Sequence, residues 1–202
     1  MAWAPSYATT ADLRAYLRVP EPVPAVTDED AAQMALAITA ASRSIDHACG
    51  RQFGNVDAST TRYYTARWSR ERVRYLVEVD DLYDDSATIT SDDTAVTDFT
   101  FEPRNAEADG RPYTVVMFGT GVSVSSVWGE IAVTSTKWGW SAVPDTIKNA
   151  TLLQASRIFK RRDAPFGVAG SPEMGSELRL LARLDPDVDV LVRAYYRWWG
   201  MR

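Results

Sequence analysis

The chain has 202 residues, 46% of them hydrophobic and 24% charged, which suits one folded domain or one domain with a large insertion. Its net charge of −5 excludes a protein that wraps nucleic acid with a broad basic face, and its single cysteine excludes an internal disulfide. It has no apolar run of membrane-spanning length, and its start lacks the basic and apolar regions of a signal peptide, so we expect synthesis in a cytoplasm.

Two helices are expected before residue 54. The segment 10–17 can be capped by Thr9 or Thr10, and three prolines between residues 20 and 24 predict an extended connection after it. A longer helix is expected to begin at Thr27 and to end at Gly50. Its apolar residues recur at spacings of four and three and form one stripe: Met34, Ile38, Ala41, Ile45 and Ala48.

From about residue 54 to residue 142 the sequence changes to short strand-like stretches. They are expected at 62–65, 74–79, 87–90, 99–101, 113–118 and 130–135. Turn-forming groups separate them at 91–93, 108–110 and 119–121, and the last of these is expected to be a hairpin turn. Partial alternation of apolar and polar residues predicts a half-buried antiparallel sheet in a small sandwich or barrel-like module.

Helices are expected again after residue 142. The first spans 143 to about 162, a flexible Gly/Pro-rich loop follows near 163–176, and a last helix is capped by Asp185 and stopped by Gly200. The apolar side of that last helix consists of Val188, Leu191, Val192, Tyr195, Trp198 and Trp199. The sequence therefore predicts an α+β fold, in which a bundle of about four helices (1–53 and 143–202) carries a large inserted antiparallel β module (54–142).

The sequence offers no constellation for catalysis. His47 and Cys49 are two residues apart on one helix, so their side chains point in different directions and cannot act as a pair. An acidic group could hold a hard cation, but a solvated loop is the favoured interpretation: Asp80, Asp81, Asp84, Asp85, Asp92 and Asp93. We therefore expect a protein that is not an enzyme and has no cofactor and no metal site.

Two segments resemble the head-to-tail connector (adaptor) family of tailed phages. The first is LRAYL at 13–17, followed by a long helix that ends in IDHACGRQF at 45–53. The second is WGWSAVPDTIKNA at 138–150 with the basic helix end IFKRRDA at 158–164, and DPDVD at 185–189 is also similar. The β-rich middle is similar to an insertion in the connectors of actinobacterial phages.

The resemblance implies a structural virion protein of a siphovirus-like particle. Family members form a ring, usually twelve-fold, in the neck below the portal vertex. They bind the portal protein on one side and a stopper or tail-completion protein on the other. Genomic DNA passes through the lumen without sequence-specific binding, and the chain's mild acidity suits such a channel. No membrane partner is expected.

The last helix is the candidate interface with the portal or with a neighbouring subunit. Its aromatic residues cover more than one helical face, so some should be exposed on a lone subunit and buried on assembly. Packing in the core of the subunit is the alternative interpretation. The candidate residues are Arg193, Tyr195, Tyr196, Arg197, Trp198 and Trp199.

A second hypothesis is a β module that binds carbohydrate or a host factor. A sugar platform needs coplanar aromatic rings on a concave face, and the candidates are Trp128, Trp138 and Trp140. Trp138 and Trp140 would project to the same side if their segment is a strand.

Overall fold

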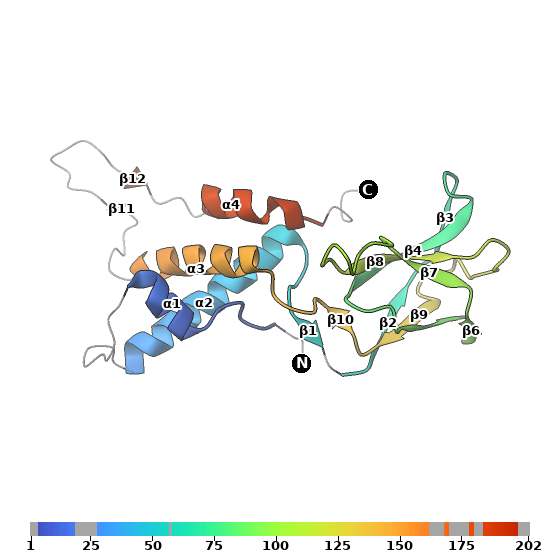
Figure 1. Cartoon of the computed structure of the whole chain (residues 1–202), viewed down its shortest axis with the longest axis horizontal. Helices are drawn as coiled ribbons and strands as arrows, with labels where there is room; N and C mark the ends of the chain where they lie inside the picture. The colour runs from blue at the N-terminus through green and yellow to red at the C-terminus, as the bar shows by residue number, and fades with distance from the viewer. Residues whose placement is uncertain are drawn as a thin grey trace. The chain divides into compact units, whose positions relative to one another are not determined.

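The computed structural model of the chain describes residues 4–18, 28–56, 58–161, 168–169, 178–179 and 184–197. The chain divides into two compact units, a helical unit (1–53 and 143–202) and a β module (54–142). Each unit is considered by itself. Four α-helices and two multi-stranded antiparallel sheets in the described ranges confirm the predicted α+β fold (Figure 1).

The helical unit is built around α3 (Asp145–Lys160), which contacts α1 (Thr10–Leu17), α2 (Asp28–Cys49) and α4 (Pro186–Val192). In Figure 1, α3 (orange) lies alongside α2 (light blue), with α4 (red) next to them. Four residues of the predicted stripe of α2, Met34, Ile38, Ala41 and Ile45, are buried. Ala48 is only half-buried, and Cys49, the last residue of the helix, is buried instead. The core that joins α1, α2 and α3 consists of Ala8, Leu13, Met34, Ala37, Ile38, Ala41 and Ala155.

The β module contains two antiparallel sheets that share one core. The first has the order β1-β10-β4-β8-β7, with β3 also beside β4, and the second has the order β2-β9-β5-β6. The strands are β1 (Asn55–Val56), β2 (Thr60–Tyr64), β3 (Arg67–Ser69), β4 (Arg74–Leu82), β5 (Thr88–Ser91), β6 (Thr94–Val96), β7 (Phe99–Glu102), β8 (Tyr113–Phe118), β9 (Ile131–Ser135) and β10 (Trp138–Gly139). Buried residues from both sheets, such as Val77 and Val116 from one and Ile89 and Val133 from the other, belong to the same cluster. The module is therefore a small β-sandwich.

The two ends of the β module meet in a short ladder. Val56 lies opposite Trp138 and Asn55 opposite Gly139, and the Trp140 backbone N–H donates to the carbonyl of Gly54 at 2.8 Å. Gly139 has a φ of +103°, and a Cβ there would lie 1.9 Å from the Gly54 oxygen. Only glycine fits at this approach. The WGW motif therefore closes the module on itself.

Most predicted strands are confirmed within two residues of their expected ends, and the turn at 91–93 connects the paired strands β5 and β6. The hairpin predicted at 119–121 is wrong. The strand before it, β8, and the strand after it, β9, belong to different sheets, so this segment takes the chain from one sheet to the other.

The last helix is shorter than predicted. α4 ends at Val192, a short 3-10 helix (η3, Arg193–Tyr195) follows, and Tyr196 is extended with ψ of 137°. The expectation of one helix to Gly200 is therefore wrong. The predicted loop at 163–176 lies mostly outside the described residues, which include Val168–Ala169 (β11), paired with Leu178–Arg179 (β12).

Candidate functional site

The C-terminal segment (residues 184–197) contains the described part of the candidate interface, and its first turn is fixed to α3. The Asp185 carboxylate caps α4 by accepting from the Asp187 backbone N–H at 2.8 Å. The same carboxylate forms an ion pair with Arg157, and the Asp185 N–H donates to Gln154 at 3.4 Å. A cap that also pairs with a neighbouring helix fixes both the start and the position of α4.

The inner face of the segment is packed within the helical unit. Val188 and Val192 are fully buried. The Tyr195 ring meets Phe53 edge to face, with centroids 5.5 Å apart. The Tyr196 hydroxyl donates to the Asp189 carboxylate, and this hydrogen bond raises the pKa of Tyr196 to about 12. Both tyrosines are half-buried and hold the segment in place.

The end of α2 provides the second anchor. The Arg197 backbone N–H donates to the Cys49 carbonyl at 2.9 Å, and the Cys49 thiol lies 3.9 Å from the Val192 carbonyl. The bond to Cys49 lies beyond the end of the helix and follows the extended conformation of Tyr196. A tertiary hydrogen bond thus replaces further helical bonds at this point.

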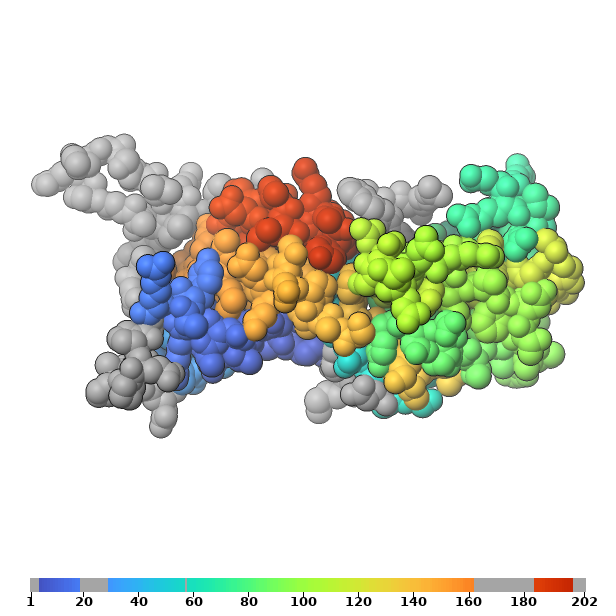
Figure 2. Space-filling model, viewed as in Figure 1, coloured from blue at the N-terminus to red at the C-terminus, as the bar shows by residue number. Residues whose placement is uncertain are grey.

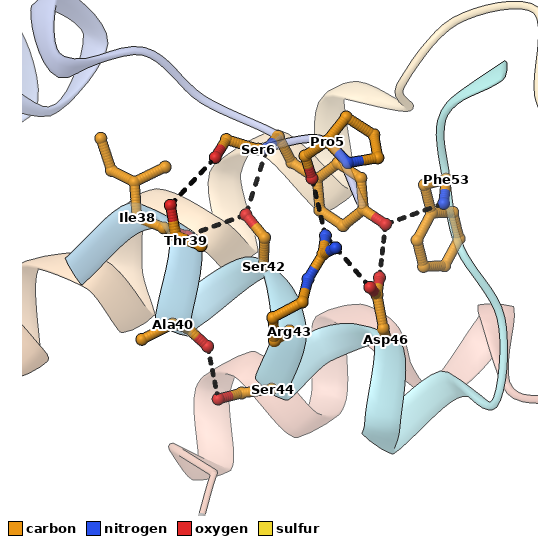
Figure 3. A network of polar contacts seen from close by, with 11 residues as sticks. Pro5, Ser6, Ile38, Thr39, Ala40, Ser42, Arg43, Ser44, Asp46 and Phe53 are labelled. Carbon is orange, nitrogen blue, oxygen red and sulfur yellow. Dashed lines mark hydrogen bonds and ion pairs between the residues drawn. The ribbon is translucent and has the colours of Figure 1, made fainter. Parts of the chain in front are cut away.

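A polar network ties the segment before α1 to α2 beside this anchor (Figure 3). The Tyr7 hydroxyl donates to the Asp46 carboxylate and accepts from the Phe53 N–H at 2.9 Å. Arg43 pairs with Asp46 at 3.1 Å and donates to the Pro5 carbonyl at 2.6 Å. Burial raises the pKa of Asp46, and burial together with the bond to Asp46 raises that of Tyr7. Figure 3 shows these groups meeting around Asp46. Phe53, which contacts the Tyr195 ring, is therefore itself held by a hydrogen bond.

The structure brings four of the six predicted interface residues together. Arg193 is exposed, whereas Tyr195, Tyr196 and Arg197 are half-buried. Trp198 and Trp199 lie outside the described residues. Tyr195 and Tyr196 therefore pack within the subunit, while Arg193 presents its side chain to solvent.

One large apolar residue that is exposed on this segment was not predicted as an interface residue. Val190 is 71% exposed, and with Asp187, Arg193 and Ala194 it forms the outer face of α4 and η3. In Figure 2 this surface (red) lies beside that of α3 (orange). Val190 is two residues from both Val188 and Val192, which places it on the opposite side of the helix. An apolar residue outside the apolar stripe was the signal that could have identified it.

His47 and Cys49 do not face each other as a pair in the structure. His47 is exposed, while Cys49 is buried and points elsewhere, and burial raises the pKa of Cys49 to about 12. No cluster of three or more His, Cys, Asp or Glu residues suited to a metal ion occurs in the ranges that the structure describes. In the acidic group, Asp80 pairs with Arg62 at 2.6 Å and Asp81 accepts from Trp140. Among the described helices, none has the length and apolarity to cross a bilayer.

The predicted sugar platform is wrong. Trp138 is fully buried and Trp140 is 5% exposed, whereas Trp128 is 87% exposed. The Trp138 indole N–H donates to the Thr60 carbonyl at 3.0 Å, and that of Trp140 donates to Asp81 at 2.9 Å. Indoles whose donors are used inside the core cannot form an open stacking surface. No coplanar platform results from these three residues.

Comparison with known proteins gives a likeness of fold. No model of a protein family matches the chain, and no curated protein matches its sequence. A chain in the neck of an empty gene transfer agent particle, computed with C6 symmetry, aligns with a TM-score of 0.59 at 18% identity, covering 100% of this chain and 97% of that one. A chain in the virion of a native gene transfer agent particle aligns with a TM-score of 0.54 at 17% identity, covering 99% of this chain and 96% of that one. At these identities the likeness establishes the fold.

Proposed function

We propose that the chain is a non-catalytic structural subunit of the neck of a phage-like particle, a head-to-tail connector. Copies assemble into a dodecameric ring between the portal protein and a stopper or tail-completion protein. Genomic DNA passes through its centre. The observation that carries the proposal is the likeness, over nearly the whole of both chains, to a chain of a gene transfer agent neck.

Three further observations support this proposal. The neck of that neighbour was computed with C6 symmetry, and a chain away from a sixfold axis is present in multiples of six, which a twelve-membered ring satisfies. The motifs at 13–17, 45–53 and 138–150, which resemble the connector family, occupy α1, the end of α2 and the closure of the β module with the start of α3. The net charge of −5 suits a lumen through which DNA slides without tight phosphate contacts.

The C-terminal segment is the proposed docking element for the portal or for the next subunit. Its inner face is held by Val188, Val192 and Tyr195, which leaves Val190 and Arg193 outward on a fixed scaffold. Arginine is enriched at protein interfaces, and an exposed apolar side chain beside it gains from being covered by a partner. The tyrosines position this face, and the outer residues make the contact.

The test is to co-express the chain with the portal protein of its own particle and to image the purified complex by electron microscopy. We expect closed rings on one face of the portal, with twelve copies of the chain. A complex that forms no ring, or a chain that never co-purifies with the portal, would overturn the proposed function.

Point variants test the docking element separately. V190D and R193E should weaken portal binding at least about tenfold, because each places an acid on the outer face. R18E, a charge reversal at another exposed arginine of the helical unit, is the matched control and should bind normally. Deletion of residues 185–202 should abolish binding and leave the β module folded. Normal binding by V190D and R193E would show that docking uses another surface.

A further inference from the structure

Half of the basic residues of the β module lie at one place, with a single acid, Glu71, among them. The module contains 8 Arg and Lys residues against 14 Asp and Glu residues, yet four of its arginines lie between residues 67 and 74. This basic hairpin consists of β3, the turn after it and the start of β4, with Arg67 opposite Leu76 and Ser69 opposite Arg74. The rest of the module is strongly acidic. A local reversal of charge on an acidic body indicates a surface selected for an acidic partner.

The basic hairpin also presents apolar side chains in an ordered way. Trp68 is 51% exposed, and its ring is held edge to face against Tyr75 at 5.0 Å. Val73 at the turn is 63% exposed. The Arg72 N–H donates to the Ser69 hydroxyl at 3.2 Å, which closes the turn. Arginine and tryptophan on a rigid hairpin are the residues enriched in protein interfaces.

The arginines of the hairpin are available for a partner. No ion pair joins them to a carboxylate in the part of the chain that the structure describes, and Arg72 contacts the sulfur of Met117 at 3.8 Å. Arg67, Arg70 and Arg72 are exposed. Their positive charges therefore face the solvent, where a partner can reach them.

An acidic surface lies at the opposite end of the same strand. β4 has nine residues, from Arg74 in the hairpin to Leu82, and Leu82 lies opposite Tyr113. Asp84 and Asp85 follow this end of β4, and the turn that contains Glu107 leads into β8; Lys137 also lies here, 5.6 Å from the Tyr83 ring. Burial, together with the charges of Asp85, Glu107 and Asp84, raises the pKa of Tyr113. These three acids define the acidic end. Nine residues of strand span roughly 26 Å, so the hairpin of one copy cannot reach its own acidic end.

We propose that the basic hairpin of one copy docks on the acidic end of the next copy, in a repeating head-to-tail contact. This inference rests on the proposed ring and deepens it by naming a contact between subunits. A contact between two different surfaces of identical chains is heterologous, and it closes into a ring when the rotation between copies permits. The acidic body around the hairpin disfavours the other polyanion, duplex DNA, because it would repel phosphates that approach the module.

Two charge-reversed variants test the contact. The hairpin variant R67E/R70E/R72E has two acidic ends, and the variant D84K/D85K/E107K has two basic ends. Each alone should lose self-association by about 100-fold or more, because like charges face each other in every contact. An equimolar mixture should assemble again, since every contact between alternating copies is then complementary. Sedimentation velocity at low salt measures the assemblies, and circular dichroism checks that each variant is folded.

The outcomes separate this contact from the proposed function. Failure of the mixture to assemble, while the wild-type chain forms rings alone or on the portal, would overturn the contact and leave the ring intact. Assembly that stops at two copies would overturn the head-to-tail arrangement. Normal self-association of the hairpin variant, together with loss of duplex DNA binding, would assign the hairpin to DNA instead. A wild-type chain that forms no ring even with the portal would overturn the proposed function itself.

Discussion

Replacing Gly139 with alanine tests how the β module closes. A Cβ at this position would lie 1.9 Å from the oxygen and 2.9 Å from the carbonyl carbon of Gly54. Both are backbone atoms, so β1 must move away from β10, and the hydrogen bond from Trp140 to Gly54 is lost. Gly121 is a matched control in the same module, because its φ of +100° is close to the +103° of Gly139 but nothing lies within 4 Å of its Cβ position.

The two variants separate backbone strain from the clash. An alanine at either φ costs about 1–3 kcal/mol. At Gly139 the lost hydrogen bond adds about 1 kcal/mol, and the displaced strand adds about as much again. We expect G139A to lower the free energy of unfolding by about 2 kcal/mol more than G121A does. Urea unfolding followed by tryptophan fluorescence measures both. Equal losses would refute the argument that the close backbone approach requires glycine.

Three further predictions follow from the local chemistry. The bond to Lys148 and the helix cap lower the pKa of Asp12 to about 2, so its stabilisation is present above the unfolded pKa near 4 and is lost as pH falls through 2. D12N should therefore lower the free energy of unfolding, measured by thermal unfolding, by about 1 kcal/mol at pH 7 and leave it unchanged near pH 2. An equal decrease at the two pH values would contradict this explanation. Cys49 should react slowly with a thiol reagent at pH 8, because burial raises its pKa to about 12, and rapid reaction of the intact chain would refute its burial. W140F should lower the free energy of urea unfolding by about 2 kcal/mol by removing a donor to the buried Asp81, whereas unchanged stability would mean that this bond contributes little.

The sequence predicts the parts of the fold that depend on local periodicity. The apolar stripe of α2 can be recognised in the sequence because one face of this long helix is buried along its length. The hairpin of β5 and β6 can be predicted from the sequence because Asp92 and Asp93 tolerate the positive φ that its two-residue turn needs. Two-residue strands such as β1 and β10 have no period to detect. They form because the ends of the β module meet, which is a property of the tertiary structure.

The candidate site shows the same limit. The sequence identifies the C-terminal segment from its cap at Asp185 and its apolar residues. It does not predict that the helix ends at Val192, because the aromatic residues beyond it continue the helical pattern. The bond from Arg197 to Cys49 and the contact of Tyr195 with Phe53 determine that end, and both partners lie far away in sequence. Exposure of Val190 and Arg193 follows from that packing.

The meeting of its two ends explains how a helical frame can carry so large an insertion. The β module begins and ends in paired strands, with Gly54 bonded to Trp140, so its removal leaves a gap that a short linker can bridge. The helical core buries Leu13, Ile38 and Ala155 without the module. We therefore expect a chain in which a short Gly/Ser linker replaces residues 55–139 to keep its helical circular dichroism and a cooperative thermal transition. A shortened chain that is unfolded would show that the helical frame depends on the module for its stability.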